Sequence, residues 1–126
     1  GAIKHIFETE GPIYSTPLVH GDDVYISSMD KRLYCLNLKT FEQKWKFDTA
    51  GRVFSNPVII NEHIFIGSND GFLYELNKDG KLENYFPAGE RIVNNVVYNP
   101  KTQKYFLWTH ANELFCLTKK DKDIKK

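Results

Sequence analysis

Residues 55–77, SNPVIINEHIFIGSNDGFLYELN, contain three short apolar runs that are separated by turn-forming residues. The runs are rich in Val, Ile, Phe and Tyr, which favours β-strands. The separator Asn69-Asp70-Gly71 predicts a tight turn, because glycine readily adopts the positive φ that such turns need. Helical periodicity is not sustained anywhere in the chain. The stretch therefore predicts an antiparallel meander of short strands.

The same pattern recurs about 40 residues away on both sides. Residues 24–37 align with residues 64–77, with apolar and turn-forming residues at matching positions. A third copy with small shifts follows at 92–117, and residues 7–11 repeat the end of a unit at 47–51. Because residue class is preserved in several separate blocks, the repeat predicts an array of equivalent structural units.

Each unit supplies four short strands, and central strands such as Val24-Tyr25-Ile26 are apolar at consecutive positions. A strand that is apolar on both faces is covered on both faces, and stacked four-stranded sheets of this kind are β-propeller blades. We predict an all-β chain whose residues 1–118 form three four-stranded blades' worth of a partial, or half, propeller. Blades at about 12–49 and 52–87 are complete, the third lacks its outer strand, and residues 3–9 are an outer strand without a blade. A β-sandwich is the structural alternative, but it does not require the repeat.

Composition limits the classes of function. The chain has 126 residues, of which 41% are hydrophobic and 26% charged, and this excludes wholesale disorder. Its 17 Lys and Arg residues balance 16 Asp and Glu residues, which argues against a nucleic-acid partner. No run of apolar residues is long enough for membrane insertion within this segment. Residues 119–126 are mostly charged, and we expect them to form a flexible tail.

The motifs Ser-x-Pro-Val-Ile, Ile-Phe-Ile-Gly-Ser-Asn-Asp-Gly and Leu-Tyr-Glu-Leu-Asn, followed by a turn that leads to Trp or Tyr, resemble the PQQ-like (quinoprotein-type) β-propeller repeat. The resemblance covers residues 3–118, and the Gly-His and Trp-Asp pairs of the WD40 repeat are absent. It implies that Trp45 packs between neighbouring blades, with Tyr85 in the same structural place one repeat later. It also favours an extracytoplasmic location, periplasmic or secreted.

Candidate chemical groups are distributed over equivalent positions of different repeats. The four histidines are His5, His20, His63 and His110. Since they form no His-x-His pair, and no Cys-x-x-Cys pair is present, we expect solvated turn histidines rather than a metal site. Asp30 and Asp70 fall at the same hairpin turn, where aspartate satisfies backbone amides.

Two further sets of residues recur with the repeat. Cys35 and Cys116 share one repeat position, too far apart within one chain for a disulfide, and we expect buried free thiols. A bridge between Cys116 of one copy and Cys35 of another could form only in a ring of two chains. Ser15, Ser55 and Asn94 begin the innermost strands, where they could line a channel mouth; we expect them to bond the backbone of a neighbouring blade.

The sequence offers no catalytic, cofactor-binding or metal-binding residues. Quinoprotein dehydrogenases, which the resemblance brings into consideration, have an adjacent cysteine pair, a calcium site and an aspartate base. This chain has no adjacent cysteines and no clustered ligand set, so we predict no cofactor, with PQQ to be considered only if the chain is part of a larger propeller. Trp108 replaces the small residues Ser27 and Gly67 of the other repeats and is a candidate contact surface.

These observations favour a non-catalytic β-propeller scaffold for protein–protein interaction or assembly. Three blades do not close into a ring in the usual geometry, so either the chain belongs to a longer propeller or a second copy completes it. In the second case the homodimer is a six-bladed ring in which residues 3–9 of each chain complete the third blade of the other. The alternatives are a fragment of a quinone-dependent dehydrogenase and a ligand- or stress-sensing ectodomain.

Overall fold

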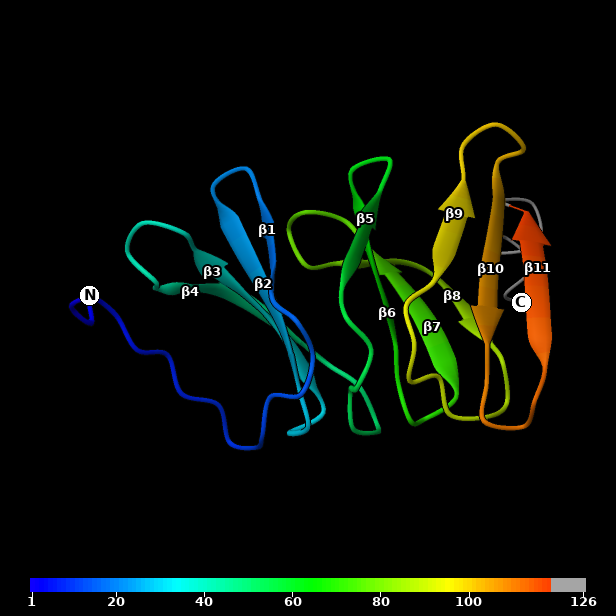
Figure 1. Ribbon diagram of the computed structural model, residues 1–126, viewed down its shortest axis with the longest axis horizontal. Helices are drawn as coiled ribbons and strands as arrows, with labels where there is room; N and C mark the ends of the chain where they lie inside the picture. Colours follow the sequence, from blue (N-terminus) through cyan, green and yellow to red (C-terminus); the bar gives the residue numbers. More distant parts are fainter. Residues whose placement is uncertain (119–126) are drawn as a thin grey trace.

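The computed structural model describes residues 1–118, which form three antiparallel sheets and no helix (Figure 1). The first sheet contains β1 (Leu18–His20), β2 (Asp23–Ser28), β3 (Arg32–Asn37) and β4 (Gln43–Asp48). The second contains β5 (Val58–Ile60), β6 (His63–Gly67), β7 (Phe72–Leu76) and β8 (Leu82–Pro87). The third contains β9 (Val97–Asn99), β10 (Lys104–Trp108) and β11 (Leu114–Thr118). The tail predicted at 119–126 lies outside the described residues.

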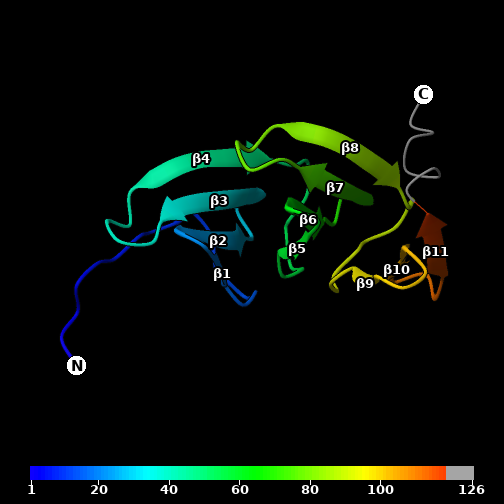
Figure 2. The ribbon, with the colours of Figure 1, turned by 90° about the horizontal axis from the view of Figure 1, so that it is seen from above.

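Strand order follows chain order in every sheet, as expected for propeller blades. The two four-stranded sheets also share an irregularity in the pairing of their third and fourth strands, at Cys35/Leu36 and at Glu75/Leu76. The three sheets lie side by side, with β1, β5 and β9 along one side of the molecule and β4 and β8 along the other (Figure 2). This arrangement confirms the partial propeller and is not that of a two-layer sandwich.

The core lies between the sheets, because successive residues of a strand point to opposite faces. Ile64 and Ile66 of β6 pack against the first sheet, whereas Phe65 between them packs against the third. The main buried residues of the first interface are Tyr25, Leu33, Cys35, Val53, Ile64, Ile66 and Leu76. Those of the second include Phe65, Leu73, Ile92, Val96, Tyr105, Leu107 and Leu117. The prediction of strands covered on both faces is confirmed for the second sheet.

Residues 3–9 form no strand in this structure, so that prediction is wrong for the single chain. A strand needs a neighbouring strand to satisfy its backbone N–H and C=O groups, and the segment has none beside it. It nevertheless runs across the outer face of the first sheet, where Phe7 packs against the buried residues of that face. Those residues are Val24, Ile26, Tyr34 and Leu36.

The opposite end of the array is uncovered. Leu114 is 68% exposed and Val97 is 49% exposed, and both lie on the third sheet. Cys116 is exposed as well, so the expectation of two buried thiols is right for Cys35 and wrong for Cys116, because none of the sheets formed by residues 1–118 covers this face of β11. The described residues contain no helix that could cross a membrane.

Candidate functional site

Trp45 connects the first sheet with the second. Its indole N–H donates a hydrogen bond to the carbonyl oxygen of Lys78, at 2.9 Å, in the turn between β7 and β8. Its ring covers Gly80, where an added Cβ would lie 2.4 Å from the indole and where φ is +82°. This turn therefore needs glycine for two independent reasons. The ring contact of Tyr85 is with Phe72 in its own sheet, so an inter-blade role for Tyr85 stays a prediction.

The N-terminal segment lies on the first sheet as β4 lies on the second. The rings of Phe7 and Tyr34 meet edge to face with centroids 5.2 Å apart and an interplanar angle of 69°. One repeat later, Phe47 and Tyr74 meet at 5.2 Å and 67°. Residues 3–9 therefore occupy the position of an outer strand that belongs to a preceding blade.

Two hydrogen bonds that recur in the next repeat anchor the end of this segment. The backbone N–H of Glu10 donates to Asp30 Oδ2 at 3.1 Å, and that of Ala50 donates to Asp70 Oδ2 at the same distance. The Thr9 hydroxyl donates to the Gly11 carbonyl at 2.6 Å, as the equivalent threonine does one repeat later. The geometry of residues 9–11 is thus that of a blade junction.

The two turn aspartates act as predicted. Asp70 accepts hydrogen bonds from the backbone N–H groups of Ala50 and Phe72, the latter at 3.0 Å. It also accepts one from the Tyr74 hydroxyl at 2.5 Å. Burial, and then the hydrogen bond to Asp70, raises the pKa of the Tyr74 phenol, which therefore remains the donor. The Asp70 carboxylate therefore holds both its own turn and the residues that follow β4.

The recurring serines bond within their own sheets, contrary to the prediction. The Ser15 hydroxyl donates to the Ser27 carbonyl at 3.0 Å, and the Ser55 hydroxyl donates to the Gly67 carbonyl at 2.8 Å. Both acceptors lie on the second strand of the same blade. A short hydroxyl that is packed against this strand does not reach the next blade. Asn94, the third member of the set, is exposed.

The residues that follow the serines link the sheets instead. The backbone N–H of Thr16 donates to Asn56 Oδ1 at 2.7 Å, and that of Asn56 donates to Asn95 Oδ1 at 3.1 Å. A row of side-chain-to-backbone hydrogen bonds therefore links the three sheets just before β1, β5 and β9 begin. The sequence contains a signal for it, since an amide or hydroxyl residue recurs at this position of each repeat, but the sequence interpretation missed it.

The histidines do not converge. His63 Nδ1 lies 2.5 Å from Glu75 Oε2, and His20 Nε2 lies 3.5 Å from Glu62 Oε1. The His63 pair corrects the expectation of a purely solvated turn residue. It spans neighbouring strands β6 and β7, so it depends on a register that the sequence does not state. His5 stacks on Phe41, with ring centroids 5.6 Å apart.

The donor groups present do not fit a quinone with its calcium ion. Over residues 1–118, no group of three or more His, Cys, Asp or Glu side chains could hold a metal ion. Cys35 is buried between the first two sheets, while Cys116 lies exposed on the far face of the third. The described residues therefore supply neither a cysteine pair nor a cation site for that cofactor.

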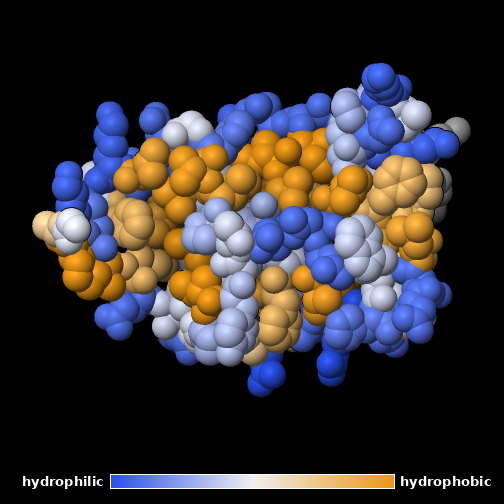
Figure 3. Space-filling view, viewed as in Figure 1, coloured by the Kyte–Doolittle hydropathy of each residue, from blue (hydrophilic) through white to orange (hydrophobic). Residues whose placement is uncertain are grey.

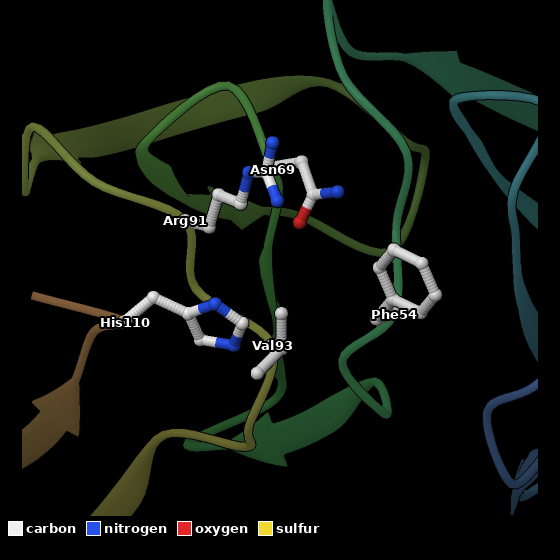
Figure 4. A pocket seen from close by; sticks show the side chains of 5 residues that line it. All are labelled: Phe54, Asn69, Arg91, Val93 and His110. Carbon is white, nitrogen blue, oxygen red and sulfur yellow. The ribbon is translucent and has the colours of Figure 1, made fainter.

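A pocket of about 320 Å³ opens between the second and third sheets. Figure 4 shows its lining, in which the Asn69 oxygen points into the space that the five side chains surround. The lining residues are Phe54, Asn69, Arg91, Val93 and His110. The sequence interpretation missed this pocket. The signal for it is Val93, which stands where the preceding repeats carry Phe54 and Tyr14.

Trp108 lies at the end of β10, opposite Leu114 in the register, and is 37% exposed. Successive residues of β10 alternate between faces, and Tyr105 and Leu107 point towards the second sheet. Trp108 therefore points to the uncovered face of the third sheet. Its use as a contact surface stays a prediction.

Comparison with known proteins identifies similar chains. The family model described as outer membrane protein assembly factor BamB matches residues 7–121. The crystal structure of BamB from Moraxella catarrhalis matches with a TM-score of 0.80 and 15% identity, over 95% of this chain and 37% of that one. The computationally designed Ika4 protein matches with a TM-score of 0.69 and 8% identity, over 81% of this chain and 63% of that one. No curated protein matches the chain.

Proposed function

Because the chain belongs to the family described as outer membrane protein assembly factor BamB, we propose that it is a non-catalytic β-propeller scaffold for protein–protein interaction or assembly, completed by a second copy of itself. The description of that family names an assembly factor, which supports a protein partner and an extracytoplasmic location for this chain. The chain spans only 37% of the BamB structure that it matches, so both remain part of the proposal.

The observation that carries the proposal is the position of residues 3–9. They lie where an outer strand of a preceding blade would lie, held by Phe7 on Tyr34 and by Glu10 on Asp30, but they have no sheet. The third sheet has the opposite deficiency, since within residues 1–118 β11 is its last strand and no described outer strand lies beside it. A second copy would supply both missing parts, once residues 3–9 adopt strand backbone beside β11 of the other chain.

The faces that would meet are also complementary. On the third sheet, the face that points away from the second sheet is apolar. Its residues are the half-buried Phe106 and the exposed Val97, Trp108, Leu114 and Cys116. In the ring it would pack on the first sheet of the other copy, much as the second sheet packs on the third. Two such contacts close a two-fold ring and cover both open strand edges, which would otherwise favour aggregation.

The pairing in the first blade predicts the register of this contact. Cys35 of β3 lies opposite Trp45 of β4. Cys116 and His5 hold these two positions in the third blade and in the N-terminal segment, so Cys116 should face His5 of the second copy. Directly opposite residues in an antiparallel pair have Cα atoms about 4.5–5.5 Å apart, which lies in the range that disulfides span.

The test is oxidative cross-linking of the variant His5→Cys. We expect a disulfide-linked dimer on a non-reducing gel, formed through Cys116 and lost in the double variant His5→Cys/Cys116→Ser. Ile6→Cys is the matched control, because the next residue points to the other face of the strand and should link poorly. Equal linkage of the two single variants, or a monomer in light scattering at micromolar concentration, would exclude the ring.

A further inference from the structure

The pocket between the second and third sheets lies where an aromatic ring would stack on Phe54 if the repeat were regular. At the junction of the first two sheets, the Tyr14 and Phe54 rings are nearly parallel, with centroids 6.2 Å apart and an interplanar angle of 4°. At the next junction Val93 takes the corresponding place beside Phe54. The smaller side chain leaves one side of the Phe54 ring bordering a cavity of about 320 Å³. Such a volume is in the range of small-ligand sites and admits one or two amino-acid residues.

Polar groups surround this apolar surface. Arg91 and His110 are both exposed, and Arg91 forms no ion pair with any carboxylate of the described chain. The backbone N–H of His110 donates to the Arg91 carbonyl at 3.2 Å, which holds the two loops together. Asn69 Oδ1 is buried and has no hydrogen-bond partner within residues 1–118. A buried acceptor without a donor is costly, so it indicates a place for a donor from outside.

We infer that this pocket binds a carboxylate-bearing peptide segment of a protein partner. The Arg91 guanidinium and a His110 ring N–H would donate to the carboxylate, since guanidinium and carboxylate groups match in shape as well as in charge. A peptide N–H would donate to Asn69 Oδ1, and the neighbouring apolar side chain would lie on Phe54 and Val93. A C-terminal residue offers all three groups within a few bonds, and an internal aspartate is the second source of the carboxylate.

The inference rests on the proposed function only in that the partner is a protein. All five lining residues lie in the second and third sheets and their loops, so one chain forms the whole pocket and closure of a ring is not required. If the chain binds the peptide as a monomer, this inference is supported and the ring is excluded. If the chain forms the cross-linked dimer but binds no peptide, the ring is supported and this inference is excluded.

The test is an NMR titration of the 15N-labelled chain with three defined probes. They are acetyl-Gly-Gly-Leu with a free carboxylate, the same peptide as its C-terminal amide, and acetyl-Gly-Asp-Leu-amide. We expect saturable shifts of the Arg91 and His110 amides with the first probe and none with the second. Shifts with the third probe show that a side-chain carboxylate suffices, and their absence shows that the chain terminus is recognised. Inorganic phosphate at the same concentration should not compete; full competition would indicate a general anion site and overturn the inference.

Three variants localise the binding. Arg91→Gln should weaken the binding of the free carboxylate at least tenfold, because one charge-assisted contact is lost. Val93→Phe restores the aromatic pair of the first junction and should fill the pocket, abolishing binding while the chemical shifts of the first sheet stay unchanged. Arg52→Gln is the matched control, since Arg52 holds the place of Arg91 at the junction that is already filled. Binding that is indifferent to Arg91→Gln, or equally sensitive to Arg52→Gln, would overturn the inference.

Discussion

At the scale of single residues, the two cysteines share a repeat position but differ in environment. Cys35 is buried between two sheets, and burial raises the pKa of its thiol to about 12, so almost no thiolate forms near neutral pH. Cys116 is exposed. In dilute native protein we expect Ellman's reagent to modify Cys116 alone, with Cys35 reacting only in denaturant. Similar rates for both thiols in the native chain would contradict this assignment.

Residue roles that follow from local geometry are the ones that the sequence predicts. Asp70 precedes glycine in a tight turn, and an aspartate there bonds nearby amides whatever the rest of the fold does. The Ser55 hydroxyl and the contact between His63 and Glu75 depend instead on which strand lies beside which residue. That information lies in the register, and the sequence does not provide it.

At the scale of elements, β4 and the N-terminal segment take equivalent places on neighbouring sheets, but Trp45 of β4 is replaced by His5 in the segment. Trp45 covers Gly80 and bonds Lys78. Because the ring is only partly buried, we expect Trp45→Ala to lower the free energy of unfolding by about 2–3 kcal/mol, below the usual range for a fully buried tryptophan. Chemical denaturation of the two proteins measures this difference in the free energy of unfolding.

His5→Ala is the matched variant at the same repeat position, and it removes only the ring contact with Phe41. We expect a change within about 0.5 kcal/mol, as for most exposed sites. A loss as large as that of Trp45→Ala would mean that the N-terminal segment is docked as firmly as a complete outer strand. A loss below about 1 kcal/mol for Trp45→Ala would argue against its role between the sheets.

The element that was predicted wrongly shows what strand propensity leaves out. Residues 3–9 hold the repeat position of β4, and Phe7 takes the side-chain contact that the repeat predicts. The backbone nevertheless stays irregular, because hydrogen bonds of a strand come from its neighbour. Sequence identifies the position of this segment in the repeat but not the chain that pairs with it.

At the scale of the whole molecule, exposed apolar surface is unevenly distributed. Hydrophobic residues form patches on the side that carries β1, β5 and β9 (Figure 3). In a closed ring this side borders the central channel. The far face of the third sheet is the other such surface, where Leu114 is 68% exposed.

Self-association through the third sheet would make thermal stability depend on protein concentration. If two chains unfold together, the melting temperature should rise by about 3 °C for each tenfold increase in concentration, given the usual unfolding enthalpy per residue. Phe106→Arg places a charge on the face that would be covered and should abolish this dependence. Leu82→Arg introduces the same charge on β8 of the second sheet, where Leu82 is 45% exposed, and should preserve it, because both neighbours of this sheet belong to its own chain. Scanning calorimetry at three concentrations decides between a chain that associates through its last blade and one that remains a partial propeller, in which all three proteins would melt independently of concentration.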